Sequence, residues 1–232
     1  MQVKTSQSVF VLDIDDYGLL LPGNEDILRI KQHYENFKIT CFTIPFPKEF
    51  FLKENWKHFT KEKYQKWAEI VNSYDWMEIA IHGFSHTTFE FDCPYNKANE
   101  MLDAIENLWK EVGLKYKKIF KAPYWQYSYD SLVALKERGY IVAIDRNFPR
   151  SVPEGLQVYV YNWSFEEKIP NVKIIKGHGH AYAREGTKNP IGECYQNIIS
   201  QIPEGAQFKF ISELAPQEMT EVWLEKRRKL QK

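Results

Sequence analysis

The sequence of 232 residues is poor in cysteine and carries no excess charge of either sign. It holds three cysteines, an odd number, with no pair at the spacing of a metal site. Neither a disulfide framework nor a cysteine-ligated metal is therefore expected, and a reducing compartment fits. Basic and acidic residues balance at 31 each. Balanced charge gives no reason to expect nucleic acid or an acidic membrane surface as a partner.

Long hydrophobic runs are also absent. Residues 1–8 are polar and lack the apolar stretch of a signal peptide, and no run is long enough to span a bilayer. We therefore expect a cytoplasmic protein that does not enter the membrane. Its length suits a single domain over 1–232, with a core over about 8–213 and a helical tail over 214–232. The sequence leaves the oligomeric state open.

Short apolar runs alternate along the chain with amphipathic helical patterns. Helical periods begin at Asn24 and Thr60, and others end at Gly113 and Gly139, whereas helix coverage thins between 147 and 172. Such alternation predicts βα units and a mainly parallel sheet. Periodicity alone does not separate a barrel from a doubly wound open sheet. The runs that predict strands are Val9–Asp15, Lys38–Ile44, Met77–Ile81, Lys118–Lys121, Ile141–Ile144, Val158–Tyr161, Val172–Lys176 and Phe208–Ile211.

Polar clusters come at the ends of four of these runs. In a barrel of parallel strands the carboxyl ends of the strands meet at one rim, and such folds carry their chemistry on that rim. The sequence therefore predicts one site built from all four clusters. They are Asp13-Ile-Asp15-Asp16, His82-Gly-Phe-Ser-His86, Lys121-Ala-Pro-Tyr124 and Gly177-His-Gly-His180.

Three of these residues have the chemistry of a metal site. Hydrolysis of an amide or ester needs an activated water, a stabilised oxyanion and a proton for the leaving group. A divalent ion on three protein ligands with open positions supplies the first two. Asp16, His82 and His86 fit that ligand set. We expect one divalent ion, and these ligands accept zinc, cobalt, nickel or manganese.

The remaining acids and histidines fit acid–base roles. Asp15 and Asp16 are adjacent, so on an extended strand they point in opposite directions and cannot both hold the ion in the same way. Asp13 shares a face with Asp15. His178 and His180 are two apart and also share a face, and a histidine suits the general acid for the leaving amine or alcohol. His178 lies nearer the strand, but His180 fits nearly as well.

In this order, the four motifs resemble those of the NodB-type polysaccharide deacetylases, carbohydrate esterase family 4. The resemblance covers about residues 8–213. It implies a distorted (β/α) barrel of seven to eight strands with one divalent metal, usually zinc. It also implies a hydrolase of carbon–nitrogen bonds other than peptide bonds, which removes acetyl groups, N-acetyl above all, from a carbohydrate. The matching segments are Asp13-Ile-Asp15-Asp16-Tyr-Gly18, His82-Gly-Phe-Ser-His86, Lys121-Ala-Pro-Tyr124 and Ile175-Lys-Gly-His178.

The resemblance also implies residue roles. Asp15 would be the general base and Asp16 the ligand, and the backbone N–H of Tyr124 would help to hold the oxyanion. His178 or His180 would be the acid. At one position the sequence departs from the family, since Lys121 stands where an arginine orients the base. Lysine offers a point charge and not a planar fork, so the tuning of the base should differ.

Further residues near the strand ends complete the predicted site. Asp145 lies near the place where the family has an aspartate that assists the catalytic groups. Aromatic side chains at or near these strand ends suit the apolar faces of sugar rings, although packing is the commoner fate of any one aromatic. The aromatic residues concerned are Tyr124, Trp125, Tyr127, Trp163 and Tyr182.

Two other functions compete with deacetylation. Asp13 and Asp15 after an apolar strand also resemble the opening motif of haloacid-dehalogenase-type phosphatases, with Asp13 as nucleophile and Asp15 as general acid. That class needs a late Gly-Asp pair, and the second half of this chain has none. The third alternative is a non-catalytic, carbohydrate-binding barrel. Retention of all three candidate ligands and both acid–base groups argues against it.

Overall fold

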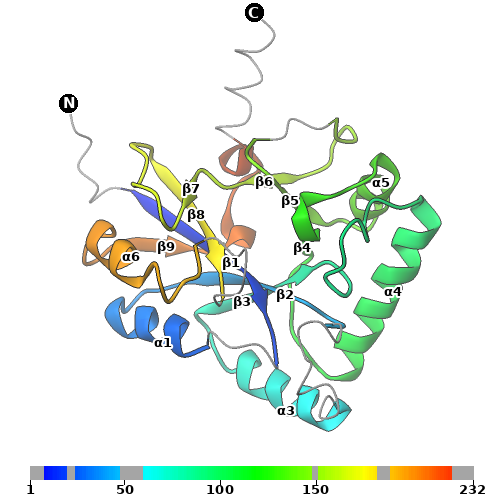
Figure 1. Ribbon diagram of the computed structural model, residues 1–232, viewed down its shortest axis with the longest axis horizontal. Helices are drawn as coiled ribbons and strands as arrows, with labels where there is room; N and C mark the ends of the chain where they lie inside the picture. Colours follow the sequence, from blue (N-terminus) through cyan, green and yellow to red (C-terminus); the bar gives the residue numbers. More distant parts are fainter. Residues whose placement is uncertain (1–7, 20–23, 48–59, 148–150, 182–188, 221–232) are drawn as a thin grey trace, which may run out of the picture.

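The computed structural model describes residues 8–19, 24–47, 60–147, 151–181 and 189–220 of the chain. Strands and helices alternate through most of them (Figure 1). The strands are β1 Val9–Tyr17, β2 Ile39–Thr43, β3 Met77–His82, β4 Ile119–Lys121, β5 Ile141–Ile144, β6 Val158–Val160, β7 Trp163–Ser164, β8 Ile174–His180 and β9 Gln207–Lys209. The helices are α1 Asn24–His33, α3 Lys61–Asn72, α4 Tyr95–Glu111, α5 Tyr129–Glu137 and α6 Tyr195–Gln201, with 3-10 turns η3 Pro123–Trp125 and η4 Ile211–Glu213.

The strands form one parallel sheet that curls into a half-barrel. Its order is β6-β5-β4-β3-β2-β1-β8-β7, and β9 pairs with the start of β1. The helices lie on the outside of the curled sheet (Figure 1). No ladder joins β6 to β7 among the described residues, so the barrel is open there. The predicted distorted (β/α) barrel is confirmed.

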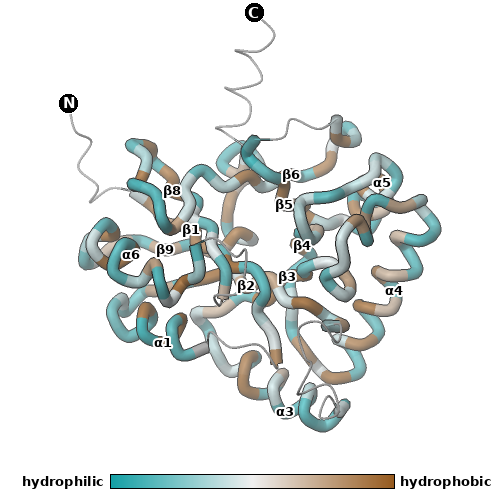
Figure 2. The backbone as a smooth tube through the Cα atoms, in the orientation of Figure 1, coloured by the Kyte–Doolittle hydropathy of each residue, from teal (hydrophilic) through white to brown (hydrophobic). Residues whose placement is uncertain are grey.

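Alternation along the strands divides the apolar side chains between two cores. Phe10, Leu12 and Ile14 of β1 pack in the larger core beneath the helices, whereas Val11 belongs to a second cluster with Phe42 of β2. Apolar side chains are buried on both faces of the sheet, and Figure 2 shows brown, apolar stretches of the strands beside pale and teal, more polar ones. The inward row that starts at Val11 continues as Asp13 and Asp15, which makes the carboxyl end of the half-barrel polar.

Helix ends follow local signals in the sequence. Thr60 caps α3 by accepting a hydrogen bond from the Lys63 backbone N–H at 3.3 Å. Gly113 and Gly139 follow α4 and α5 with φ of 73° and 75°, in the left-handed region that glycine adopts without strain. These three predictions are confirmed.

β7 and α6 were not predicted, because both are short and carry no clear periodicity. In the stretch where helix coverage was predicted to thin, the described residues form β6, which matches the predicted strand Val158–Tyr161, and β7. Most of the predicted tail over 214–232 lies outside the described residues. None of the described helices combines the length and the apolar character that crossing a membrane requires.

Candidate active site

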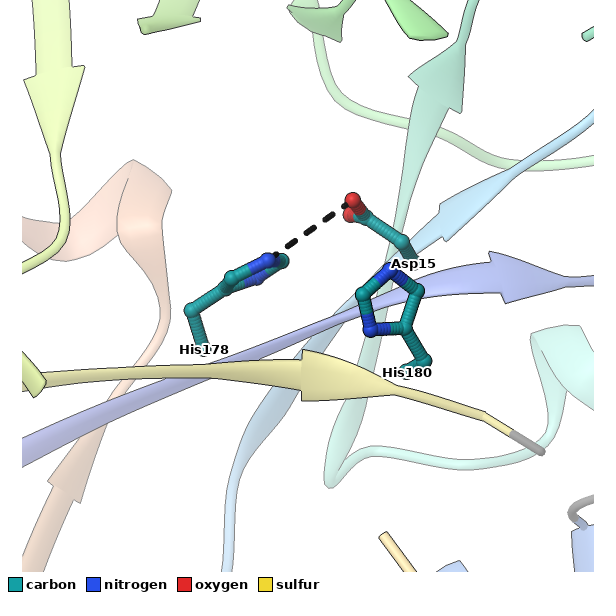
Figure 3. A group of neighbouring side chains, drawn as sticks. All are labelled: Asp15, His178 and His180. Atoms are coloured by element: carbon teal, nitrogen blue, oxygen red, sulfur yellow. Dashed lines mark ion pairs between the residues drawn. The ribbon is translucent and has the colours of Figure 1, made fainter. Parts of the chain in front are cut away.

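The register of β1 against β8 gathers two acids and two histidines. In this parallel pair Asp13 is opposite His178 and Asp15 is opposite His180. Residues paired in this way point to the same face of a sheet, here the inside of the half-barrel. Figure 3 shows the three side chains of Asp15, His178 and His180 turned toward one another. Two strands that are distant in sequence therefore form a single polar cluster.

Asp16, His82 and His86 form a second cluster beside the first. Asp16 Oδ1 lies 3.5 Å from His82 Nε2 and 3.0 Å from His86 Nε2. Two ligand atoms that each lie about 2.1 Å from a tetrahedral ion are about 3.4 Å apart. All three side chains are buried. The three ligands predicted from sequence thus come together at distances that suit one metal ion.

Hydrogen bonding selects the ring nitrogen that His82 offers to an ion. Its Nδ1 lies 3.1 Å from the backbone carbonyl oxygen of Lys121. A carbonyl oxygen only accepts hydrogen bonds, so Nδ1 carries the proton and Nε2, which faces Asp16, carries the lone pair. A backbone carbonyl on the outer nitrogen is the usual support of a metal-binding histidine. This detail supports a metal site on His82.

Backbone strain is concentrated at this end of the half-barrel. The structure describes six non-glycine residues with positive φ, and the one away from the two clusters and their partners is Phe89. Such conformations cost about 1–3 kcal/mol each and persist where the surrounding structure imposes them. Their concentration supports a functional site. The other five are Asp16, His86, Tyr124, Trp125 and Asn189, with φ between 52° and 61°.

Glu90 holds the segment that carries His86. Its Oε1 accepts a hydrogen bond from the Phe84 backbone N–H at 2.6 Å. Its Oε2 accepts from the backbone and hydroxyl groups of Ser85 and Thr87, at 3.0 to 3.1 Å. One carboxylate therefore fixes the backbone on both sides of a candidate ligand. Glu90 was not predicted from the sequence, since an acid four residues after a histidine is not a distinctive signal.

Asp15 lies between the candidate ligands and the candidate acid. Its Oδ1 is 2.7 Å from Lys121 Nζ, and its Oδ2 is 3.8 Å from His82 Nε2 and 3.9 Å from His178 Nε2. Burial would raise the pKa of Asp15, but the charges of Lys121 and the surrounding histidines outweigh burial and hold its pKa well below the usual range. Asp15 is therefore an ionised carboxylate at neutral pH.

His178 is held by a buried acid. Its Nδ1 lies 2.8 Å from Asp13 Oδ1, and Tyr159 donates its hydroxyl hydrogen to Asp13 Oδ2 at 3.1 Å. Burial works to raise the pKa of Asp13, but the charges of Lys121 and His178 lower it below its usual value. An ionised carboxylate accepts, so His178 Nδ1 donates, and its Nε2 faces Asp15. Asp13 thus orients the candidate acid.

Asn189 holds His180 in a similar way. The Asn189 amide nitrogen donates to the His178 carbonyl oxygen at 3.2 Å and to the Ser164 hydroxyl. Its amide oxygen therefore faces His180 Nδ1, at 2.8 Å. Because an amide oxygen only accepts, His180 Nδ1 carries the proton. Asn189 was not predicted from the sequence, since an asparagine nine residues after a histidine is not a distinctive signal.

Two predicted aromatics line the site. Tyr124 is 53% exposed, and its ring lies 5.5 Å from that of His86. Trp125 meets His178 edge-on at 5.5 Å and stacks on Tyr161 at 5.6 Å. Lys121 Nζ also lies 4.8 Å from the Trp125 ring. These side chains border the acid–base groups, where a sugar ring could contact an exposed aromatic face.

The structure does not bring every predicted residue to the site. Trp163 is fully buried, and its Nε1 donates to the Glu167 carbonyl oxygen. Tyr127 is buried and donates to the Ala143 carbonyl oxygen at 2.6 Å. Asp145 is half-buried, and its carboxylate accepts from the backbone N–H of Asn147 at 2.7 Å. Tyr182, the last predicted aromatic, lies outside the described residues.

Comparison with solved structures identifies the fold. A family 4 carbohydrate esterase from Streptomyces lividans, solved in complex with acetate, matches with a TM-score of 0.54 and 12% identity, over 92% of this chain and 96% of the other. The peptidoglycan deacetylase PdaC from Bacillus subtilis matches with a TM-score of 0.55 and 13% identity, over 98% and 96%. The chain therefore has the NodB-like fold of carbohydrate esterase family 4, and the resemblance seen in the sequence is confirmed for the fold.

A third match limits what the fold implies. It is a family 4 pseudoenzyme from Bacillus anthracis, with a TM-score of 0.53 and 17% identity, over 90% of this chain and 65% of that one. The same fold thus occurs with and without activity, and function has to be argued from the site. No protein-family model and no curated protein matches the sequence.

Proposed function

We propose that this chain is a metal-dependent hydrolase that removes acetyl groups, N-acetyl above all, from a carbohydrate. One observation carries the proposal. The carboxylate of Asp15 lies 3.8 Å from Nε2 of the candidate ligand His82 and 3.9 Å from Nε2 of the candidate acid His178. A base between a metal site and a proton donor is what hydrolysis of an acetyl group requires.

The donor set fits one divalent ion. Asp16, His82 and His86 are three nitrogen and oxygen ligands of the kind that zinc takes in catalytic sites. Asp13, Asp15 and Asp16 bring three carboxyl groups to one lysine, Lys121, so a divalent cation would offset negative charge at this end of the half-barrel. When bound, the ion would polarise the acetyl carbonyl and lower the pKa of a water molecule.

The chain's own residues would handle the protons. Asp15, ionised and within reach of both clusters, would take the proton of the attacking water. His178, with Nδ1 donating to Asp13, would deliver a proton from Nε2 to the leaving group. An amine leaves poorly as an anion, so a positioned acid matters most for an N-acetyl group. The backbone N–H of Tyr124 would support the oxyanion, and its exposed ring would contact the sugar.

The phosphatase alternative finds little support in the geometry. Its nucleophile would be Asp13, which is fully buried and bonded to Lys121, His178 and Tyr159. Because both oxygens of this buried carboxylate already make hydrogen bonds, neither can reach and attack a phosphate. The non-catalytic alternative keeps one specific support, the pseudoenzyme among the solved structures of this fold.

Acetate release tests the proposal directly. The purified chain, stripped with chelator and reloaded with zinc or cobalt, should release acetate from N-acetylated sugar oligomers only when a metal is present. Asp15→Asn should keep the metal and lose about 10²–10⁴-fold in rate. His33→Ala, a histidine change on the exposed side of α1, is the matched control. Metal binding without acetate release from N- or O-acetylated sugars would favour the binding-protein alternative.

A further inference from the structure

Asp15, His178 and His180 form a set of three metal-ligand side chains separate from Asp16, His82 and His86. One ligand atom from each of the three residues lies within 4.8 Å of the others. Figure 3 shows the carboxylate of Asp15 facing the two imidazoles. Deacetylation needs only one general acid, so the proposed mechanism gives no role to the second histidine of this set.

Outer contacts prepare both histidines as ligands through the same ring atom. Nδ1 of His178 donates to Asp13 Oδ1 at 2.8 Å, and Nδ1 of His180 donates to Asn189 Oδ1 at 2.8 Å. When either ring is neutral, its lone pair is therefore on Nε2, and a cation would compete with the proton for that atom. A carboxylate or amide oxygen on the outer nitrogen is the arrangement that fixes metal-binding histidines.

Asp15 uses its two oxygens differently. Its Oδ1 bonds to Lys121 Nζ at 2.7 Å, and its Oδ2 lies between His82 Nε2 at 3.8 Å and His178 Nε2 at 3.9 Å. The latter distance is close to the separation of about 3.4 Å between ligands of one tetrahedral ion. A small shift of the His178 ring toward Asp15 would bring these two atoms to that separation.

We propose that Asp15, His178 and His180 bind a second divalent cation, and that this ion inhibits the enzyme. A cation there would occupy the base and the acid together. The site binds more weakly than the Asp16 site by at least about tenfold, because Lys121 and the first ion place positive charge beside it. Binding at the second site stands on the geometry alone, whereas the inhibition rests on the proposed deacetylase function.

Metal binding by the full chain tests the site without reference to activity. Apo protein is titrated with zinc to about 1 mM by isothermal calorimetry, and with cobalt by visible absorption. Wild type should take two ions, one tight and one weak. His180→Ala should keep the tight ion and lose the weak one, whereas His86→Ala should weaken the tight ion. His33→Ala, with an exposed side chain, should still take two.

The outcomes decide between the site and its alternatives. Saturation of wild type at one ion, or a weak ion that survives in folded His180→Ala, overturns the second site. Should His180→Ala fail to fold, zinc anomalous density from wild-type crystals grown with excess metal decides by its presence or absence beside Asp15. Acetate release should fall over the same zinc range as weak binding. A chain that takes two ions and releases no acetate refutes the proposed function but not the site.

Discussion

Asp13 and His178 form a buried carboxylate–imidazole pair, with 2.8 Å between Oδ1 and Nδ1. Tyr159 donates to the other oxygen of Asp13, and Lys121 Nζ lies 2.6 Å from Oδ1. The pair sits directly across the ladder between β1 and β8. Such a carboxylate fixes the orientation of the ring and stabilises the imidazolium, which is the form that acts as a general acid.

Replacement of Asp13 should therefore impair the acid while sparing the metal. We expect Asp13→Asn to lower kcat about 10²–10⁴-fold, because an amide no longer stabilises a charged His178. Metal content, measured by elemental analysis, should stay at the wild-type level. The nitrogen chemical shifts of His178 should report a changed proton distribution on the ring, which a purely structural defect would not produce. Asp145→Asn is the matched control and should keep nearly full activity, since Asp145 contacts Asn147. If Asp145→Asn lost most of its activity and Asp13→Asn did not, the carboxylate that supports the general acid would be Asp145 and not Asp13.

Lys121 supplies the positive charge next to two buried acids. Its Nζ lies 2.6 Å from Asp13 Oδ1 and 2.7 Å from Asp15 Oδ1, and all three side chains are nearly inaccessible to solvent. Lys121→Met keeps the length of the side chain and leaves two buried carboxylates without their cation. We expect the free energy of unfolding of the apo protein, from urea titration, to fall by about 3–5 kcal/mol. Lys115→Met, on the exposed surface, should change it little. A loss no larger than that of the control would mean that Lys121 is not needed to keep the acids buried.

Glu90 should control the metal affinity through the backbone around His86. Glu90→Ala removes the acceptor of the hydrogen bonds from Phe84, Ser85 and Thr87. We expect zinc affinity, measured by competition with a coloured chelator, to fall about 10–100-fold, as for other outer contacts of metal ligands. Asp92→Ala removes an exposed acid two residues away and should bind zinc normally. Normal zinc binding by Glu90→Ala would show that the segment holds its shape without this carboxylate.

Glu78 should make stability depend on pH at the other end of the half-barrel. Burial raises the pKa of Glu78 above its usual 4.5, although hydrogen bonds from Ser212 and Thr40 oppose the shift. The folded protein therefore holds this proton to higher pH than the unfolded chain does. The stability that Glu78 contributes is complete below the unfolded pKa and is lost as the pH rises through the folded pKa.

Glu78→Gln, a neutral side chain of the same shape, should not lose stability in this way. The difference in Tm between Glu78→Gln and wild type should therefore grow in favour of the variant from about pH 4 to about pH 8. Differential scanning calorimetry measures it, with Glu69→Gln on the exposed side of α3 as the control. A difference that is constant across this range would contradict a raised pKa in the folded protein.

The sequence by itself predicted the parallel sheet, most strand positions and the rim on which the polar motifs meet. Apolar runs bounded by caps and glycines are local signals, so β5 Ile141–Ile144 and the cap at Thr60 follow from neighbouring residues alone. The grouping of Asp16 with His82 and His86 also follows, because parallel strands end on the same side of a sheet.

Only the tertiary structure decided which partners each group has. The contact of Asp13 with His178 depends on the pairing and register of β1 with β8, two strands more than 150 positions apart. Asn189 contacts His180, and Trp163 is buried in the core although its position in the sequence favoured the rim. Local periodicity fixes the face on which a side chain lies. Strand order and register, which are set by packing between distant segments, fix what that side chain touches.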